Sequence, residues 1–191
     1  MSDPVHNLSD ANRKALLQIA RDSIAHGLKT RRPLKVEVAA QPKELQALRA
    51  TFVTLDLHGD LRGCIGSLKA SLPLAADVAH NAFEAAFSDP RFGPLTPAEF
   101  QDLEIHVSVL SPLEKMRFTS EADFLKQLRP GVDGILLQDG FMGGTFLPSV
   151  WEQLPKKEDF LAHLKMKAGL PMTYWSDTLT AWRYTTEYFP S

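Results

Sequence analysis

Apolar residues recur at helical spacing in four parts of the chain. Between residues 10 and 26 they line one side of a predicted helix, for which Ser9 is a candidate N-cap and Gly27 a candidate stop. The same spacing predicts three further helices, after Pro73, over residues 121–128 and over residues 160–168.

A hairpin is predicted around His58-Gly59-Asp60, between strands at residues 51–57 and 61–68. If Leu57 pairs with Leu61 across a three-residue loop, apolar and polar side chains separate onto opposite faces. A two-residue loop would bring Asp60 and Arg62 onto the apolar face, so the first register is predicted. It places Val53, Leu55, Leu57, Leu61 and Ile65 on one face and Thr54, Asp56, Arg62 and Cys64 on the other.

Other segments have the alternation of strands. Residues 103–109 predict a half-buried strand that points Glu104, His106 and Ser108 to one side. A second hairpin is predicted between residues 135–137 and 145–147, around Asp139-Gly140.

Two further segments are extended in character. Residues 181–189 are aromatic, with Trp182, Tyr184 and Tyr188 on one face, and residues 36–38 are a candidate short strand. Hairpins interspersed with helices, without regular strand–helix alternation, predict an α+β fold with a mainly antiparallel sheet and flanking helices.

Length and composition are those of a globular chain. The 191 residues are 44% hydrophobic and 23% charged, which gives room for one large domain or two small lobes. The formal net charge is 21 basic minus 23 acidic, or -2, so no broad field attracts DNA or an anionic membrane.

The same sequence features bear on location. The longest stretch without acidic or basic residues, 140–151, is too short to span a bilayer. The first four residues lack the features of a secretory signal, and a single cysteine, Cys64, fits a reducing compartment. We therefore expect a cytoplasmic protein.

The segment Leu61-Arg62-Gly63-Cys64-Ile65-Gly66 is the most informative for chemistry. Residues two apart on a strand share a face, so the Arg62 guanidinium and the Cys64 sulfur are expected to be neighbours. A nearby cation favours the nucleophilic thiolate, and the glycines let a ligand approach the backbone. The structural alternative is that Cys64 packs as a small hydrophobe while Arg62 pairs with Asp56.

A cysteine nucleophile needs a base, and the candidate is His106, oriented by Glu104 or Asp56. Sharing a strand face does not place these residues near Cys64, so a structural histidine is the alternative. His58 and His80 are weaker candidates.

Asp89 and Arg91, in a proline-rich loop, are candidates for binding an anion or positioning a substrate. The alternative for this pair is a turn cap and a solvated cation. The six histidines are scattered and there is no second cysteine, so no metal site and no cofactor are predicted. Residues 63–69 lack the Gly-Lys-Ser/Thr end of a phosphate loop.

An ordered set of motifs over nearly the whole chain resembles the AMMECR-type domain family, the first component of the AmmeMemoRadiSam system. The set is far more specific than any one motif. Its members are Phe52-Val53-Thr54-Leu55, Leu61-Arg62-Gly63-Cys64-Ile65-Gly66, Asp89-Pro90-Arg91-Phe92, Pro94-Leu95-Thr96, Val107-Ser108-Val109-Leu110, Gly131-Val132-Asp133-Gly134, Thr145-Phe146-Leu147-Pro148 and Lys167-Ala168-Gly169-Leu170.

The resemblance implies one domain over residues 1–191, made of two unequal lobes around a cleft that holds the signature hexapeptide. It implies Memo-like and radical-SAM partner proteins, which would carry any redox metal, but no particular reaction. Residues that it carries over are Arg62 and Cys64 as candidate catalytic residues and Asp89, Arg91 and Thr145 as candidate substrate-binding residues. His106 belongs to none of the motifs.

Two functions follow as hypotheses. The first is an enzyme or enzyme subunit that binds a small polar or anionic substrate beside Cys64 and Arg62. The second is a non-catalytic adaptor or binding module for the partner proteins. RNA modification assisted by partner enzymes is a third, with little support from a mildly acidic chain.

Overall fold

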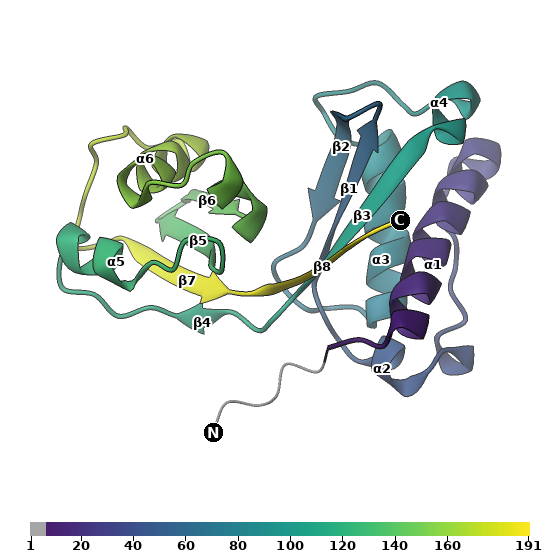
Figure 1. The fold of residues 1–191 in the computed structure, drawn as a ribbon, viewed down its shortest axis with the longest axis horizontal. Helices are drawn as coiled ribbons and strands as arrows, with labels where there is room; N and C mark the ends of the chain where they lie inside the picture. The colour runs from purple at the N-terminus through teal and green to yellow at the C-terminus, as the bar shows by residue number, and fades with distance from the viewer. Residues whose placement is uncertain (1–6) are drawn as a thin grey trace. The chain divides into compact units, whose positions relative to one another are not determined.

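The computed structural model describes residues 7–191 and divides into two compact units. Unit 1 runs to Ser111 and includes Glu187–Ser191, and unit 2 is Pro112–Thr186. Each unit has its own four-stranded sheet and hydrophobic core (Figure 1). The α+β fold with antiparallel sheets is confirmed, while the single domain of two lobes around a cleft stays a prediction. The first four residues, used above to argue against a secretory signal, lie outside the described residues.

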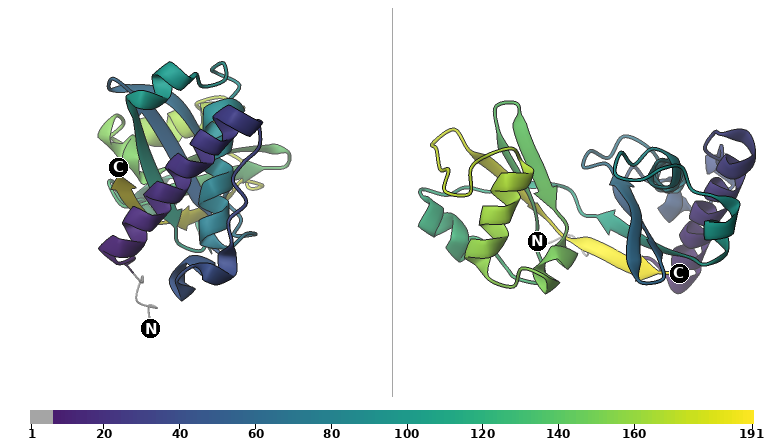
Figure 2. Two further views of the ribbon diagram at one scale, coloured as in Figure 1. Left: turned by 90° about the vertical axis from the view of Figure 1, so that its right-hand side faces the viewer. Right: turned by 90° about the horizontal axis from the view of Figure 1, so that it is seen from above.

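Unit 1 has two layers. Helices α1 and α3 pack against each other and against one face of a sheet with the strand order β2-β1-β3-β8 (Figure 1, Figure 2). The elements are α1 (Asp10–Thr30), the 3-10 turn η1 (Val38–Ala40), α2 (Lys43–Gln46), β1 (Thr51–Leu57), β2 (Asp60–Gly66), α3 (Leu74–Phe87), α4 (Pro97–Gln101), β3 (Leu103–Leu110) and β8 (Thr186–Pro190).

Helix α1 begins as predicted but ends later. The Ser9 side chain caps it by accepting a hydrogen bond from the backbone N–H of Asn12. Gly27, the predicted stop, lies inside the helix, where an added Cβ would be 2.5 Å from Cε2 of Phe87. This glycine therefore serves close packing between α1 and α3, not helix termination. Residues 36–38, a candidate strand, form none, and Val38 opens η1.

The β1–β2 hairpin has the predicted register except at its turn. Leu55 pairs with Gly63 as predicted, but Leu57 pairs with Asp60, so the loop is only His58-Gly59. Both loop residues have positive φ, 54° and 86°, as a tight primed turn requires. A bulge that inserts Arg62 into β2 restores the predicted pairing beyond it.

The bulge also changes one face assignment. Leu61 pairs with Asp56, so it shares the face of Asp56 rather than that of Leu55, and it is exposed. The prediction that Leu61 joins the apolar face is wrong, because the inserted residue reverses the alternation at that point.

Unit 2 is built on a sheet with the order β4-β7-β5-β6. The predicted second hairpin and the two later helices are present. The elements are β4 (Glu114–Lys115), α5 (Glu121–Gln127), β5 (Gly134–Asp139), β6 (Met142–Phe146), the 3-10 turn η2 (Pro148–Glu152), α6 (Lys157–Lys167) and β7 (Thr180–Tyr184). Among the helices of residues 7–191, none combines the length and the hydrophobicity that a membrane span requires.

The last aromatic segment is two strands, not one. Strand β7 pairs in the unit 2 sheet, whereas β8 pairs in the unit 1 sheet. Trp182 and Tyr184 therefore do not share a sheet face with Tyr188, contrary to prediction. Glu187 fixes β8 in unit 1, because its carboxylate accepts hydrogen bonds from Leu8 N at 2.8 Å and from the Arg13 guanidinium. Alternation alone does not show where a chain changes sheet.

Candidate functional site

Cys64 lies on β2, at the edge of the unit 1 sheet. Its side chain is half-buried, and its Sγ is 3.2 Å from Oγ1 of Thr54, the directly opposite residue of β1. Its backbone N–H donates to Oδ2 of Asp89 at 2.9 Å. An edge strand leaves one row of N–H groups without a strand partner, and Asp89 satisfies one of them.

Asp89 also holds Arg91. The carboxylate, 4% exposed, accepts hydrogen bonds from the backbone N–H, Nε and Nη2 of Arg91 at 3.0, 3.1 and 2.8 Å. The hydrogen bonds from Arg91 hold the pKa of Asp89 well below its usual range. The Arg91 side chain itself stays 54% exposed, so a buried carboxylate fixes an accessible guanidinium.

Arg91 is a cation that interacts electrostatically with Cys64. Hydrogen bonding to Asp89 raises the pKa of Arg91, and Cys64 adds a smaller electrostatic contribution in the same direction. From the sequence, Arg62 is expected beside the thiol, and that expectation stays a prediction. That expectation depended on an unbroken strand, whereas the bulge removes Arg62 from the regular alternation.

Arg62 binds elsewhere in the same cluster. Its Nε and Nη2 donate to the Glu99 carboxylate at 2.9 and 3.2 Å, and Nη2 also donates to the Gly93 carbonyl at 3.0 Å. Hydrogen bonds, first from Arg62 and then from Thr96, lower the pKa of Glu99 from 4.5 to about 2. The alternative in which Arg62 pairs with Asp56 is not what these contacts show, because Oδ2 of Asp56 lies 2.9 Å from Nε2 of His106.

One aromatic ring connects the two arginines. The guanidinium carbons of Arg62 and Arg91 lie 5.6 and 5.5 Å from the centroid of the Phe92 ring, within cation–π range. Four of the five predicted site residues, namely Arg62, Cys64, Asp89 and Arg91, therefore form one cluster in unit 1. Each arginine in it has a carboxylate partner, so the cluster is close to neutral.

The candidate base, His106, lies on β3, which is separated from β2 by β1. His106 on β3 is directly opposite Thr54, which is directly opposite Cys64, so β1 lies between the histidine and the cysteine. The His106 ring faces the Asp56 carboxylate through Nε2 and bonds the Tyr188 hydroxyl through Nδ1 at 2.7 Å. Of the two acids proposed to orient His106, Asp56 has this contact.

Thr145, the fifth predicted site residue, belongs to unit 2. Its hydroxyl donates to the carbonyl of Ile135 at 2.8 Å and lies 2.8 Å from the hydroxyl of Tyr184. These bonds tie β6 to β5 and β7, which gives Thr145 a structural role within its own sheet.

Glu99 is a site residue that was not predicted, although the sequence holds a signal for it. Thr96-Pro97-Ala98-Glu99 is a capping box with proline at the first helical position, and both reciprocal hydrogen bonds form in α4. The box places Glu99 at a fixed helix start, where it meets Arg62. Tyr188 was missed as a partner of His106 because β8 was not recognised as a strand of unit 1.

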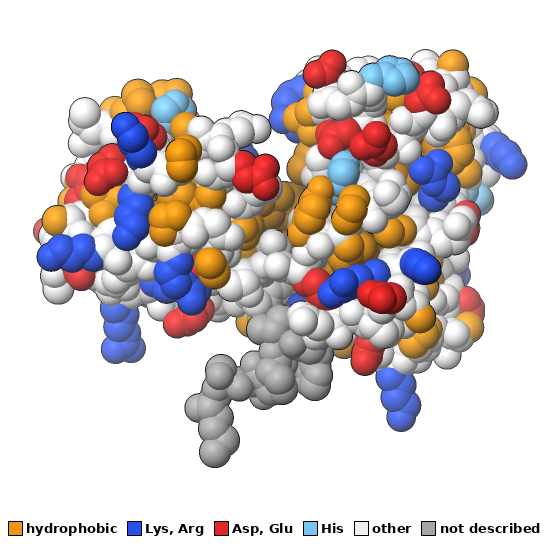
Figure 3. All heavy atoms as spheres, in the orientation of Figure 1, with side chains coloured by type: hydrophobic (Ala, Val, Ile, Leu, Met, Phe, Trp, Pro, Cys, Tyr) orange, Lys and Arg blue, Asp and Glu red, His pale blue; other side chains and the backbone are white. Residues whose placement is uncertain are grey.

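Charge on the visible surface is mixed. On the face drawn in Figure 3, acidic and basic side chains are interspersed on each unit, in keeping with a net charge of -2. Residues 7–191 hold no group of three or more His, Cys, Asp or Glu side chains able to bind a metal ion.

The fold and the motif residues match a known family. The AMMECR1 family pattern matches residues 17–189, and the chain belongs to this family. A protein of Methanothermobacter thermautotrophicus is 36% identical over 95% of both chains. A protein of Thermotoga maritima is 40% identical over 78% of this chain and 82% of its own.

A solved structure agrees with the fold. The crystal structure of an uncharacterised protein from Pyrococcus horikoshii aligns with a TM-score of 0.90 and 31% identity, covering 97% of this chain and 94% of that one. The likeness extends over both units of the chain.

Proposed function

We propose that the chain is a cytoplasmic enzyme, or an enzyme subunit, that binds a small polar or anionic substrate beside Cys64. The observation that carries the proposal is the buried Asp89 carboxylate, which bonds both the backbone N–H of Cys64 and the half-exposed guanidinium of Arg91 and so holds the two residues together. Arg91 takes the substrate-binding role, and Cys64 supplies the nucleophile.

The geometry favours directed recognition. A guanidinium has five N–H donors in a fixed plane, and Asp89 accepts from Nε and Nη2. The donors outside those two bonds suit a carboxylate or phosphate oxygen. Because Asp89 balances the charge of Arg91, affinity would come from these hydrogen bonds rather than from a net positive field.

The thiol has its own support. A fixed cation stabilises a thiolate, the form that attacks electrophiles. The Thr54 hydroxyl, 3.2 Å from Sγ, can donate to that thiolate and hold its direction. Arg62 and Glu99 position the segment around Phe92 and are positioning residues in this proposal.

Alkylation of Cys64 tests the proposal. We expect the reaction rate of anionic iodoacetate, relative to that of neutral iodoacetamide, to be higher at Cys64 than at a free thiol, because the N–H donors of Arg91 outside its bonds to Asp89 bind the iodoacetate carboxylate. The Arg91→Met variant should lower that ratio by about tenfold, the equivalent of one charge-assisted hydrogen bond. Arg32→Met, which removes an exposed arginine of the same unit, is the matched control and should leave the ratio unchanged.

Two results would contradict it. A thiol that stays unreactive until the chain unfolds would remove the nucleophile. An iodoacetate-to-iodoacetamide ratio that Arg91→Met does not alter would remove the anion-binding role of Arg91.

The second candidate is a non-catalytic adaptor for Memo-like and radical-SAM partner proteins. Phe141, at the tip of the β5–β6 hairpin, is fully exposed, and Met142 beside it is 46% exposed, as in residues that dock on other proteins. Capture of those two partners that Phe141→Ser abolishes, and that Cys64→Ala leaves intact, would favour this function over the first.

A further inference from the structure

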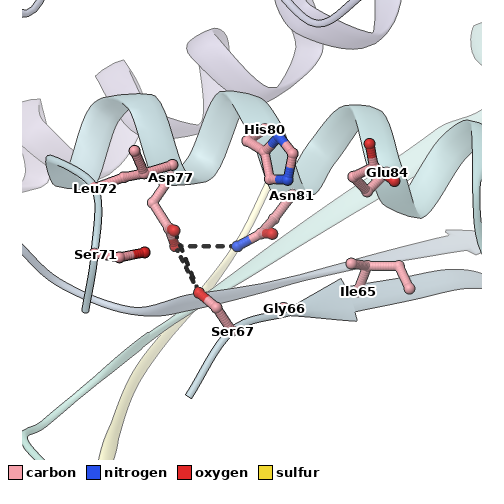
Figure 4. Close-up of a pocket in the computed structure, with 9 residues that line it drawn as sticks. All are labelled: Ile65, Gly66, Ser67, Ser71, Leu72, Asp77, His80, Asn81 and Glu84. Carbon is pink, nitrogen blue, oxygen red and sulfur yellow. Dashed lines mark hydrogen bonds between the residues drawn. The ribbon is translucent and has the colours of Figure 1, made fainter. Parts of the chain in front are cut away.

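A cavity of about 490 Å³ opens between α3 and the end of β2, and Cys64 does not line it (Figure 4). This volume lies in the range of small-molecule sites. Its floor is polar although buried, because Asp77 and Asn81 are only 2% and 3% exposed. The lining residues are Ile65, Gly66, Ser67, Ser71, Leu72, Asp77, His80, Asn81 and Glu84.

The Asp77 carboxylate is unevenly bonded. Its Oδ2 accepts from Thr51 Oγ1 at 2.6 Å and from Asn81 Nδ2 at 3.0 Å. Its Oδ1 has one long hydrogen bond among the described residues, from Ser67 Oγ at 3.2 Å. A carboxylate oxygen has room for two donors, so Oδ1 can accept another from the cavity.

The free acceptor position on Oδ1 matters because Asp77 is buried. Desolvation is the largest cause and raises the pKa of Asp77, against the opposing hydrogen bonds from Thr51 and Ser67 and a weaker charge interaction with His80. The ionised carboxylate is therefore incompletely solvated by its neighbours. A cation placed in the cavity would supply the interaction that burial removed.

The lining selects the kind of cation. Asp77 and Glu84 are its acidic residues, His80 is its one titratable base, and no lysine or arginine lines it, so the carboxylates outnumber the basic groups and anions are disfavoured. A metal ion does not fit either, since residues 7–191 contain no grouping of three suitable side chains. An ammonium group has three donors and needs no such grouping.

We propose that this cavity binds a small primary amine, with its ammonium group on Asp77 Oδ1 and Ser67 Oγ. Figure 4 shows Asp77 and Asn81 extending from α3 toward Ser67, which follows the last residue of β2. Ile65 and Leu72 provide the apolar wall for the alkyl part. The proposal does not depend on the function assigned to Cys64.

Titration of the ¹⁵N-labelled full chain with 1,4-diaminobutane tests the proposal. We expect saturable shifts of the Asn81 side-chain amide and the Ser67 backbone amide. Succinate, a dianion of the same length, should cause no such shifts. Asp77→Asn should weaken amine binding by about tenfold or more, the loss expected for a charge-assisted contact.

Matched variants separate the site from general charge effects. Glu84→Gln at the rim removes one charge without touching the buried network and should weaken binding about threefold, as a partly screened charge would. Asp60→Asn, an exposed change in the same unit, should not alter it. Chain alkylated at Cys64 should bind the amine equally well, which keeps this test separate from that of the thiol.

Three outcomes would overturn the proposal. Succinate could shift the same signals as strongly, the shifts could spread over exposed acidic residues without saturating, or both cavity variants could bind with the affinity of Asp60→Asn.

Discussion

Asp89→Asn is the substitution that tests most of the candidate site at once. The carboxylate accepts hydrogen bonds from one backbone N–H of Cys64 and from three donors of Arg91, at 2.8–3.1 Å. An asparagine keeps one acceptor oxygen and turns an NH2 group toward the remaining donors. The variant thus leaves donors unpaired in a place that is 4% exposed.

The expected loss of stability follows from these contacts. Removing one partner of a buried charged pair costs about 3–5 kcal/mol, and the half-exposed Arg91 can recover part of its loss from water. We therefore expect Asp89→Asn to lower the free energy of unfolding by about 3 kcal/mol at pH 7. Asp60→Asn, on the surface, should change it by less than about 0.5 kcal/mol.

The pH dependence has a definite sign. The pKa of Asp89 is lowered in the folded chain, so its ionised form stabilises the fold above the unfolded pKa of about 4. That contribution is lost as the pH falls through the folded pKa. The stability gap between the unsubstituted chain and Asp89→Asn should therefore be constant from pH 7 to about 5 and shrink below about 4.

Urea unfolding followed by circular dichroism at the helical signal is the suitable assay. The three tryptophans lie in unit 2, so their fluorescence would report on the wrong unit, whereas α1 and α3 dominate the helical signal of unit 1. A variant within about 0.5 kcal/mol of the unsubstituted chain at pH 7, or a gap that widens on acidification, would refute the reasoning.

Two further substitutions test the surroundings of Cys64. Gly63→Ala should destabilise unit 1 by about 3 kcal/mol or more in urea unfolding, because its Cβ would lie 2.1 Å from the Ala85 carbonyl oxygen, a backbone atom that cannot turn aside; unchanged stability would contradict this close approach. Glu99→Gln should cost about 1–2 kcal/mol at pH 7, since the partner Arg62 is 11% exposed and Glu99 27%. With the Glu99 pKa lowered to about 2, that cost should shrink below about pH 4, and a cost independent of pH would argue against the ion pair.

Much of the fold was predictable from the spacing of apolar residues, because each unit buries the apolar faces of its helices and strands in its own core. In helix α3 the predicted apolar face, with Leu74, Val78 and Ala82, is fully buried. Strand β1 likewise buries Val53 and Leu55, as its alternation predicts. The errors arose where tertiary contacts decided the outcome. Glycine commonly ends a helix, but the rings of Phe83 and Phe87 of α3 pack where a side chain of residue 27 would be, so Gly27 lies inside the helix.

The hairpin turn shows the same limit at a smaller scale. Alternation alone required a three-residue loop, because it assumed that no residue was inserted. His58-Gly59 can form a two-residue turn, and a bulge at Arg62 then restores the pairing. The alternation correctly predicted which residues of β1 and β2 pair beyond the turn. It did not reveal the bulge at Arg62, which makes that pairing compatible with a two-residue turn.

The candidate site was predictable in membership but not in its pairings. Arg62, Cys64, Asp89 and Arg91 do form one cluster, yet Glu99, the partner of Arg62, is 37 positions away along the chain. No local rule connects two such positions. The path of the loop after α3, which carries Asp89 and the capping box, determines which carboxylate each arginine meets.

The signature hexapeptide combines structural and chemical residues, and this distinction decides how its variants should be interpreted. Gly63 admits the backbone of α3, and Arg62 anchors Glu99, so changes there disturb the strand that carries Cys64. Activity lost in those variants would not establish a catalytic role for either residue. Cys64→Ala removes only the sulfur and leaves the backbone N–H that Asp89 accepts, and Arg91→Met removes a half-exposed cation. Cys64→Ala is therefore the change that can assign chemistry directly, whereas Arg91→Met also removes the guanidinium partner of the buried Asp89 carboxylate, so its stability must be measured beside its activity.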